Sequence, residues 1–220
     1  MDGYRAKAYF WIIGIATALI TWNLYYTGYF DAATSFRHAL FQTVSIASTT
    51  GFASSDFNLW PDFSRYVLLL LMFVGGCSGS TAGGMKVSRF VILLKVTWAE
   101  LRRTIHPRLV YSIKMGGRNV PPVVVGNVTR FFYLYMIVFS TLTLLISLTG
   151  LSMLDSMGII AACMSSVGPA FGIVGPTATY ADVSTFGRLV VIAAMILGRL
   201  EIFTLLIIMR PDFWRVKRNW

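Results

Sequence analysis

Residues 63–99 read FSRYVLLLLMFVGGCSGSTAGGMKVSRFVILLKVTWA, and this stretch decides the fold class. An apolar run, 63–74, stops at ten residues rich in glycine, serine and threonine, 75–84, and a second apolar run follows from Val87 to about Ala99. Apolar segments interrupted by glycine are typical of broken helices in membranes, where irregular backbone must be buried in protein or line water. The stretch therefore predicts an integral membrane protein with a loop held at membrane depth.

The composition agrees with a membrane protein. Of the 220 residues, 56% are hydrophobic and 13% are charged, whereas soluble domains carry about 25% charged residues. The net charge of +10 is concentrated in three flanks, 5–7, 89–130 and 210–218, with acidic residues mostly elsewhere. Basic loops mark the cytoplasmic side of a membrane, so both termini are expected inside. We expect no nucleic-acid partner, because no basic stretch carries a groove-reading motif.

The order of apolar segments predicts an all-α integral membrane fold. Three segments approach or exceed the ~20 residues that span a bilayer, and two shorter ones, 39–48 and 158–165, end at glycine-bearing turns. The long segments are 8–26, 131–151 and 183–209. The same order of parts occurs twice along the chain: an outer helix, a short re-entrant pore helix, a filter loop and an inner helix. We place the first unit at 1–106, a basic cytoplasmic linker at 107–121 and the second unit at 122–220.

Sequence identity supports a duplication. Phe63-Ser64-Arg65-Tyr66-Val67 matches Phe186-Gly187-Arg188-Leu189-Val190 at an offset of 123 residues. The turn glycines Gly51 and Gly168 align at an offset of 117. One difference between the units is of interest: where the first breaks at Gly76, the second carries Arg199 and is expected to continue as an apolar helix through Glu201.

The two glycine-bearing turns are candidate ion-binding segments. Glycine allows positive φ and close approach of the backbone, so successive carbonyls can point one way and replace an ion's hydration shell. A short helix that aims its C-terminal end at the site also favours a cation. The alternative is an ordinary helix cap followed by a loop.

Two basic residues are candidates for a gate. An arginine at the membrane centre costs at least about 2.5 kcal/mol, so Arg199 is expected to face water or protein. An unneutralised guanidinium in a cation pore is an electrostatic barrier. Alternatives remain: Arg199 could pair with Glu201 of a neighbouring helix, and Lys86 could extend to the membrane interface.

The sequence contains incomplete versions of two enzyme motifs, the phosphate-binding loop and the nucleophile elbow. Gly79–Gly84 is followed by Met85 and only then by Lys86, so the lysine comes one position late for a phosphate-binding loop, and the residue after it carries no hydroxyl. Ser78 lacks the second glycine of a nucleophile elbow. We expect no enzyme. A non-conducting membrane scaffold or assembly subunit remains the alternative.

Several motifs together resemble one family, the TrkH-type subunits of the Trk/Ktr/HKT cation-transporter superfamily. The resemblance covers nearly the whole chain. It rests on Ser48–Phe52, which looks like a filter sequence, on Gly75–Lys86, on His106-Pro107 with Val110–Lys114, and on Leu197–Leu205 with Pro211–Arg215.

The resemblance implies a potassium-uptake pore of four repeats, of which this chain would supply the third and fourth. Either the chain is a fragment, which we expect, or copies must assemble. The potassium filter residues would be Ser48, Thr49, Thr50, Gly51, Ser166, Val167, Gly168 and Pro169. The gate residues would be Gly76, Ser78, Gly79, Ser80, Thr81, Gly83, Gly84, Lys86 and Arg199.

The resemblance also implies the surroundings of the protein. Family members are homodimers in the bacterial inner membrane and bind a cytoplasmic TrkA-like regulatory subunit that takes NAD(H) or ATP. The chain itself is expected to bind no cofactor, with potassium as the transported ion; selectivity against sodium and coupling to protons or sodium stay open. One departure stands out: where relatives commonly read Asn-Asn-Leu-Gly-Pro-Gly-Leu-Gly, residues 165–172 read SSVGPAFG, so the side-chain amides are lost.

Overall fold

The structure, a computed structural model, describes residues 2–77, 80, 82–106, 113–200 and 207. It is mostly helical. The helices are α1 (Asp2–Tyr26), α2 (Ala32–Ala47), α3 (Asp62–Val74), α4 (Val87–Ile105), α5 (Pro122–Ser147), α6 (Met153–Met164) and α7 (Thr185–Arg199). Short 3-10 turns and one strand pair complete it: η1 (Phe57–Leu59), η2 (Gly172–Val174), η3 (Tyr180–Asp182), β1 (Lys114–Met115) and β2 (Arg118–Asn119).

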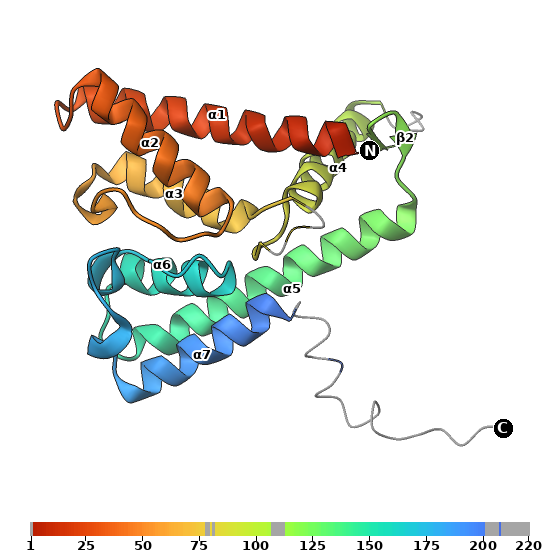
Figure 1. Cartoon of the computed structure of the whole chain (residues 1–220). Coiled ribbons are helices and arrows are strands. Elements are labelled where there is room, and N and C mark those ends of the chain that lie inside the picture. Colours follow the sequence, from red (N-terminus) through yellow and green to blue (C-terminus); the bar gives the residue numbers. More distant parts are fainter. Residues whose placement is uncertain (1, 78–79, 81, 107–112, 201–206, 208–220) are drawn as a thin grey trace, which may run out of the picture.

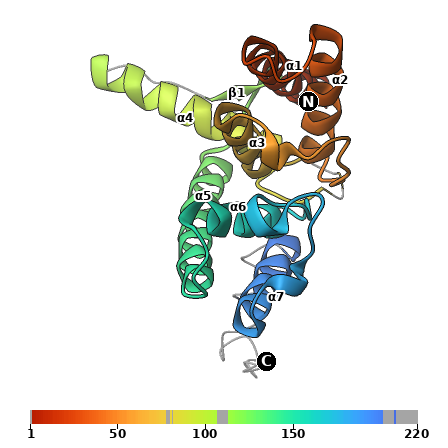
Figure 2. The ribbon, with the colours of Figure 1, turned by 90° about the vertical axis from the view of Figure 1, so that its left-hand side faces the viewer.

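The helices form two groups that meet along α3 and α6. In Figure 1, α1–α3 make up the upper half and α5–α7 the lower half, and α3 contacts α6. Seen from the end at the left of Figure 1, α4 extends away from the other helices (Figure 2). Fully buried side chains from both groups share one core, among them Ile20, Met72, Ile146, Ile160 and Met164. The two groups are therefore packed as one body.

Hydroxyl and carboxylate caps fix where the short helices begin. The Asp31 side chain accepts from the Thr34 amide at 3.3 Å at the start of α2. The Ser152 hydroxyl accepts from the Asp155 amide at 3.1 Å at the start of α6. Each cap satisfies one of the amides that the first helical turn leaves without a partner. Both re-entrant helix predictions, 39–48 and 158–165, therefore fall on helices that start earlier than the apolar runs do.

The predicted interruption after residue 74 is confirmed. Gly75 ends α3 with φ 66°, and Lys86 precedes α4 with φ 69°. The connection folds back on the end of α3, because the amide of Val87 donates to the carbonyl of Gly76 at 3.0 Å. Positive φ at Gly75 suits a residue without a Cβ.

Two of the expected helices have different bounds. The segment expected at 131–151 forms a helix from Pro122 to Ser147, because proline is favoured in the first turn and therefore starts the helix earlier. The last segment, expected at 183–209, is helical in Thr185–Arg199 and bends at Leu200. Glycine is a poor helix former, and Gly198 lies just before this bend. The continuation through Glu201 lies outside the described residues.

The all-α expectation also misses one short hairpin. Lys114 pairs with Asn119 and Met115 with Arg118 in an antiparallel ladder. Its two turn residues, Gly116 and Gly117, have φ of 58° and 82°, which is what a tight hairpin with two positive-φ residues requires.

Large apolar side chains cover the outer faces of the long helices. Trp11, Trp22 and Tyr26 of α1 and Leu144 of α5 are each 60–78% exposed. By length and composition, Ala6–Tyr26 and Pro122–Ser147 could cross a membrane. Large apolar side chains exposed in this number are costly in water and fit a hydrocarbon environment.

Candidate functional site

The turns that follow α2 and α6 have the same backbone. Thr49 and Ser166, neither of them glycine, have φ of 57° and 56°, and Gly51 and Gly168 have φ of 80° and 100°. Non-glycine residues rarely adopt positive φ, so its presence at both positions marks a constrained conformation.

The backbone hydrogen bonds repeat at the offset of 117 residues as well. The Thr50 amide donates to the Ser45 carbonyl at 2.9 Å, and the Val167 amide donates to the Ala162 carbonyl at 2.9 Å. Two further pairs match: Thr49 to Ile46 with Ser166 to Cys163, and Ser48 to Val44 with Ser165 to Ala161. Each short helix therefore ends in the same tight turn.

The two turns touch each other. A Cβ placed on Gly51 would overlap the carbonyl oxygen of Val167 and would lie 3.1 Å from Cδ of Pro169. Glycine is therefore required at position 51 for two reasons: its φ is positive, and the Val167 carbonyl lies too close to admit a Cβ. The structure thus brings together the filter residues expected from the two halves of the sequence.

Different side chains hold the two turns. In the first turn, the buried Ser45 hydroxyl, on α2 itself, donates to the carbonyl of Phe52 at 2.6 Å. In the second turn, the hydroxyl of Tyr180, from η3, donates to the carbonyl of Gly168 at 2.7 Å. Neither residue was singled out from the sequence. Neither belongs to a recognisable motif, and each acts on a backbone carbonyl several residues away along the chain.

A third contact ties the outer loop of the first half to the second turn. The side-chain amide of Asn58, in η1, donates to the Gly172 carbonyl at 2.9 Å and accepts from the Gly172 amide at 2.9 Å. Beside it, the rings of Phe57 and Phe171 pack edge to face with centroids 5.4 Å apart. The partners are 114 residues apart, so no local sequence signal could have indicated the pair.

The glycine-rich connection lies against both turns. The Gly83 amide donates to the Thr49 hydroxyl at 3.3 Å, and a Cβ on Gly83 would overlap the Ser165 carbonyl. The Ser165 hydroxyl in turn donates to the Met72 carbonyl at the end of α3. Of the expected gate residues, Gly76, Ser80, Gly83, Gly84, Lys86 and Arg199 are described; Ser78, Gly79 and Thr81 lie outside the described residues.

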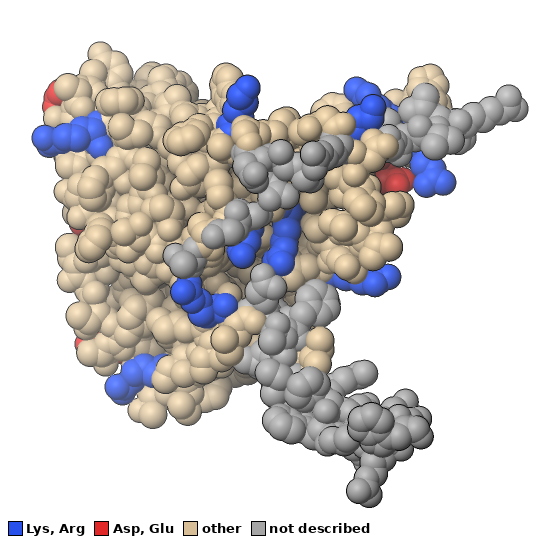
Figure 3. All heavy atoms as spheres, turned by 45° about the vertical axis from the view of Figure 1, so that its right-hand side comes forward, with Lys and Arg blue, Asp and Glu red and all other residues tan. Residues whose placement is uncertain are grey.

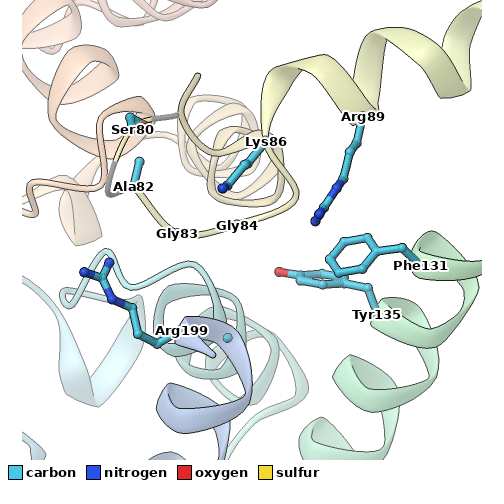
Figure 4. Close-up of a pocket in the computed structure, with 10 residues that line it drawn as sticks. Ser80, Ala82, Gly83, Gly84, Lys86, Arg89, Phe131, Tyr135 and Arg199 are labelled. Atoms are coloured by element: carbon cyan, nitrogen blue, oxygen red, sulfur yellow. The ribbon is translucent and has the colours of Figure 1, made fainter. Parts of the chain in front are cut away.

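A cavity of about 170 Å³ lies beside this connection. In Figure 4, the Arg89 side chain and the Tyr135 hydroxyl point toward each other, the Lys86 side chain extends toward the Gly83–Gly84 backbone, and the Arg199 side chain lies on the other side of that backbone. Arg89 also lies over the Phe131 ring, 4.1 Å from its centroid. Arg199 borders a second groove, of about 570 Å³, together with Ser166, Val167 and Gly168. Three basic side chains are therefore gathered just past the two turns.

Metal-ligand chemistry from side chains is not evident in the described part of the chain. Among those residues, no group of three or more His, Cys, Asp or Glu side chains could hold a metal ion. The oxygen atoms at the turns are those of backbone carbonyls and, in the first turn, of the Ser48 and Thr50 hydroxyls, which are 2.7 Å apart. Such oxygens are the ligands that replace the water around an alkali cation.

Comparison with known proteins now identifies the family. The family model described as "TrkH: Cation transport protein" matches residues 10–215. The chain belongs to this family. The Trk system potassium uptake protein TrkH of Vibrio parahaemolyticus is 45% identical over 190 residues, which are 86% of this chain and 38% of that protein. The TrkH of Escherichia coli K12 is 38% identical over 206 residues, 94% of this chain and 42% of that protein.

A solved structure agrees with the family assignment. The crystal structure of the potassium transporter TrkH from Vibrio parahaemolyticus superposes with a TM-score of 0.88 at 40% identity, covering 96% of this chain and 45% of that one. The chain thus spans less than half the length of these relatives. The resemblance to TrkH-type subunits is confirmed, and so is the expectation of a transporter family rather than an enzyme.

Proposed function

We propose that this chain forms two of the four repeats of a potassium-uptake pore, with the turns at 48–51 and 166–169 as two strands of its selectivity filter. The observation that carries the proposal is that the two turns share one backbone conformation and touch at Gly51 and Val167. Ordinary helix caps, the alternative reading of these segments, need not share non-glycine positive φ or approach each other. The relatives' printed description, potassium uptake, supplies the ion.

The unit order supports the two-repeat reading. Each half reads as long helix, short helix, tight turn and second long helix: α1, α2 and α3–α4, then α5, α6 and α7. We infer units at 1–106 and 122–220 joined by the linker at 107–121. Because the relatives are more than twice as long as the matched region, a preceding half with two further repeats would complete the pore.

The gate proposal rests on the packing of the glycine-rich connection. Gly83 contacts both turns, and Lys86 and Arg199 both line the cavity beside it. Positive side chains next to a cation path raise an electrostatic barrier. We infer that the connection closes the path and that Arg199 contributes to the closed state.

The distribution of charge supports a membrane orientation. In Figure 1, the N-terminus, α4 and the hairpin lie at one end, and the connections between α1 and α2 and between α5 and α6 lie at the other. Basic residues such as Lys95, Arg102 and Arg103 belong to the first end, and Asp31 belongs to the second. On the face in Figure 3, Lys and Arg side chains are widespread and Asp and Glu are sparse. We propose the bacterial inner membrane, with the basic end in the cytoplasm.

Further partners follow from the family resemblance. We propose a homodimer and a cytoplasmic nucleotide-binding regulatory subunit that docks on the basic end. These proposals have a separate test: co-purification of a tagged and an untagged copy, and of the chain with that subunit. Loss of regulatory-subunit binding in Arg102→Glu/Arg103→Glu would support the basic end as its docking surface.

Growth tests the transport proposal directly. A potassium-uptake-deficient bacterium would express the chain alone, and the chain joined to the N-terminal half of the Vibrio parahaemolyticus relative. Rescue at low potassium by the joined form is the expected result, and Arg199→Ala in that form should increase potassium flux. Failure of both forms, with membrane expression confirmed, would favour a non-conducting scaffold, and rescue with unselective sodium entry would favour a sodium-permeable member.

A further inference from the structure

The carbonyl of Gly168 has an unusual need for an external hydrogen-bond donor. It belongs to the peptide bond before Pro169, which has no N–H, so this peptide can be held only through its oxygen. Gly168 itself has φ of 100°, and a Cβ built on it meets no atom within 4 Å. Local sterics therefore leave the orientation of this carbonyl weakly determined.

Tyr180 supplies the missing donor. Its hydroxyl lies 2.7 Å from the Gly168 oxygen and 3.4 Å from the sulfur of the buried Cys163 in α6. The residue opens η3, whose N-terminus is capped by the Thr179 hydroxyl, an acceptor for the Ala181 amide at 3.4 Å. The half-buried ring is thus fixed at both ends, by a capped turn and by two partners at its tip.

The first turn is held by a different donor, acting on a different carbonyl. There, Ser45 donates from α2 to the Phe52 carbonyl at 2.6 Å. The position 117 residues later is Ala162, which has no hydroxyl. The second turn thus lacks a hydroxyl on its own short helix at this position. Its brace comes instead from the outer loop, where Tyr180 donates to the carbonyl of Gly168, the residue before the Phe52 counterpart Pro169.

We propose that Tyr180 is a positioning residue of the ion filter: its hydroxyl fixes the Gly168 carbonyl and thereby sets the discrimination between potassium and sodium. This inference rests on the proposed function. Discrimination between these ions depends on how firmly a set of carbonyl dipoles is held around the ion. Removing one hydrogen bond while keeping the ring should loosen one dipole and leave the path open.

The variant Tyr180→Phe removes the hydroxyl alone. Its matched control is Tyr66→Phe on α3, because Tyr66 is 58% exposed. Each would be made in the chain joined to the N-terminal half of the Vibrio parahaemolyticus relative and reconstituted in liposomes. The permeability ratio of potassium to sodium is read from the reversal potential. Tyr180→Phe should lower the ratio about 2- to 10-fold, the equivalent of one net hydrogen bond, and Tyr66→Phe should not change it.

A purely structural role would lower the amount of active protein and leave the ratio unchanged, so an unchanged ratio in Tyr180→Phe overturns the proposal. Hydrogen exchange of the purified 220-residue chain separates this failure from failure of the proposed function. If the wild type does not conduct, the proposed function fails. Faster exchange of the Val167 and Ala170 amides in Tyr180→Phe, and not in Tyr66→Phe, would still show that the Tyr180 hydroxyl holds the second turn. Equal exchange in all three proteins would overturn it.

Discussion

The turn after α2 and the turn after α6 follow the same backbone path, but different parts of the chain hold them in place. The first is braced by Ser45 of its own short helix. The second is braced from the outer loops, by Tyr180 on Gly168 and by Asn58 on Gly172. The common path follows from how each short helix ends and from glycine at the same place, both of which are local. The braces are individual, so the second turn depends on residues from both halves of the chain.

The largest expected effect is a difference in folding stability between alanine variants of the two turn glycines, Gly51 and Gly168. Gly51→Ala should destabilise the fold by about 2–5 kcal/mol, because it adds a positive-φ penalty and an overlap with the Val167 carbonyl. Gly168→Ala should cost about 1–2 kcal/mol, since the added Cβ meets no atom within 4 Å. Unfolding of the purified variants in detergent measures both. Equal losses would mean that the turns do not touch at Gly51.

The next effect tests whether the glycine-rich connection is packed on the second turn. Gly83→Ala places a Cβ on the Ser165 carbonyl and should cost about 1–3 kcal/mol while increasing potassium flux through a displaced gate. Gly126→Ala, in α5 with open space around it, is the control and should stabilise by about 0.5–1 kcal/mol. Flux assays and thermal unfolding of the same preparations decide; a Gly83→Ala protein as stable as wild type contradicts this packing.

A smaller effect is expected from the contact between the two halves. Asn58→Ala leaves the amide and the carbonyl of Gly172 without their partner and should destabilise by about 1–3 kcal/mol. Asn127→Ala, on α5, provides an asparagine control away from the turns. Because the Asn58 contact reaches the second turn, hydrogen exchange should quicken at residues 170–174 and remain slow at 49–51. Faster exchange at residues 49–51 instead would show that Asn58 holds the first turn rather than the second.

The smallest effect concerns the brace of the first turn. Ser45→Ala removes one hydrogen bond and should cost about 0.5–1.5 kcal/mol. The reciprocal change, Ala162→Ser, offers a donor to the Pro169 carbonyl, the counterpart of Phe52, and should partly restore the potassium-to-sodium ratio of Tyr180→Phe by holding the carbonyl next to Gly168. Reversal potentials of the single and double variants measure this. No restoration would show that the two positions are not equivalent.

Sequence patterns predicted features that depend on local chemistry. The break after Val74, the two short helices and the equivalence of Gly51 and Gly168 all followed from glycine and apolar runs, and the structure confirms the break and the helices. Features that depend on distant partners could not be predicted. Asn58 and Tyr180 carry no motif, and their roles appear only when the outer loops lie over the second turn. The bend at Leu200 was missed because the apolar pattern continues past it.

The cavity residues show the same division. Lys86 and Arg199 stood out because charge is rare in apolar segments, and both line the cavity that the structure places beside the glycine-rich connection. Arg89 and Tyr135 line the same cavity but were not singled out. A basic residue in a basic flank and an aromatic residue in a membrane helix are both ordinary in sequence, so only their position in space indicates a role.

The reversal potential of the joined chain in a bilayer, with potassium on one side and sodium on the other, tests the central claim most directly. If the two turns form part of a potassium filter, the wild type should reverse near the potassium equilibrium potential. Gly51→Ser should shift the reversal potential toward zero, because the added side chain disturbs both turns at their contact. A wild type that reverses near zero, or a Gly51→Ser variant that matches a selective wild type, would contradict the assignment of these turns.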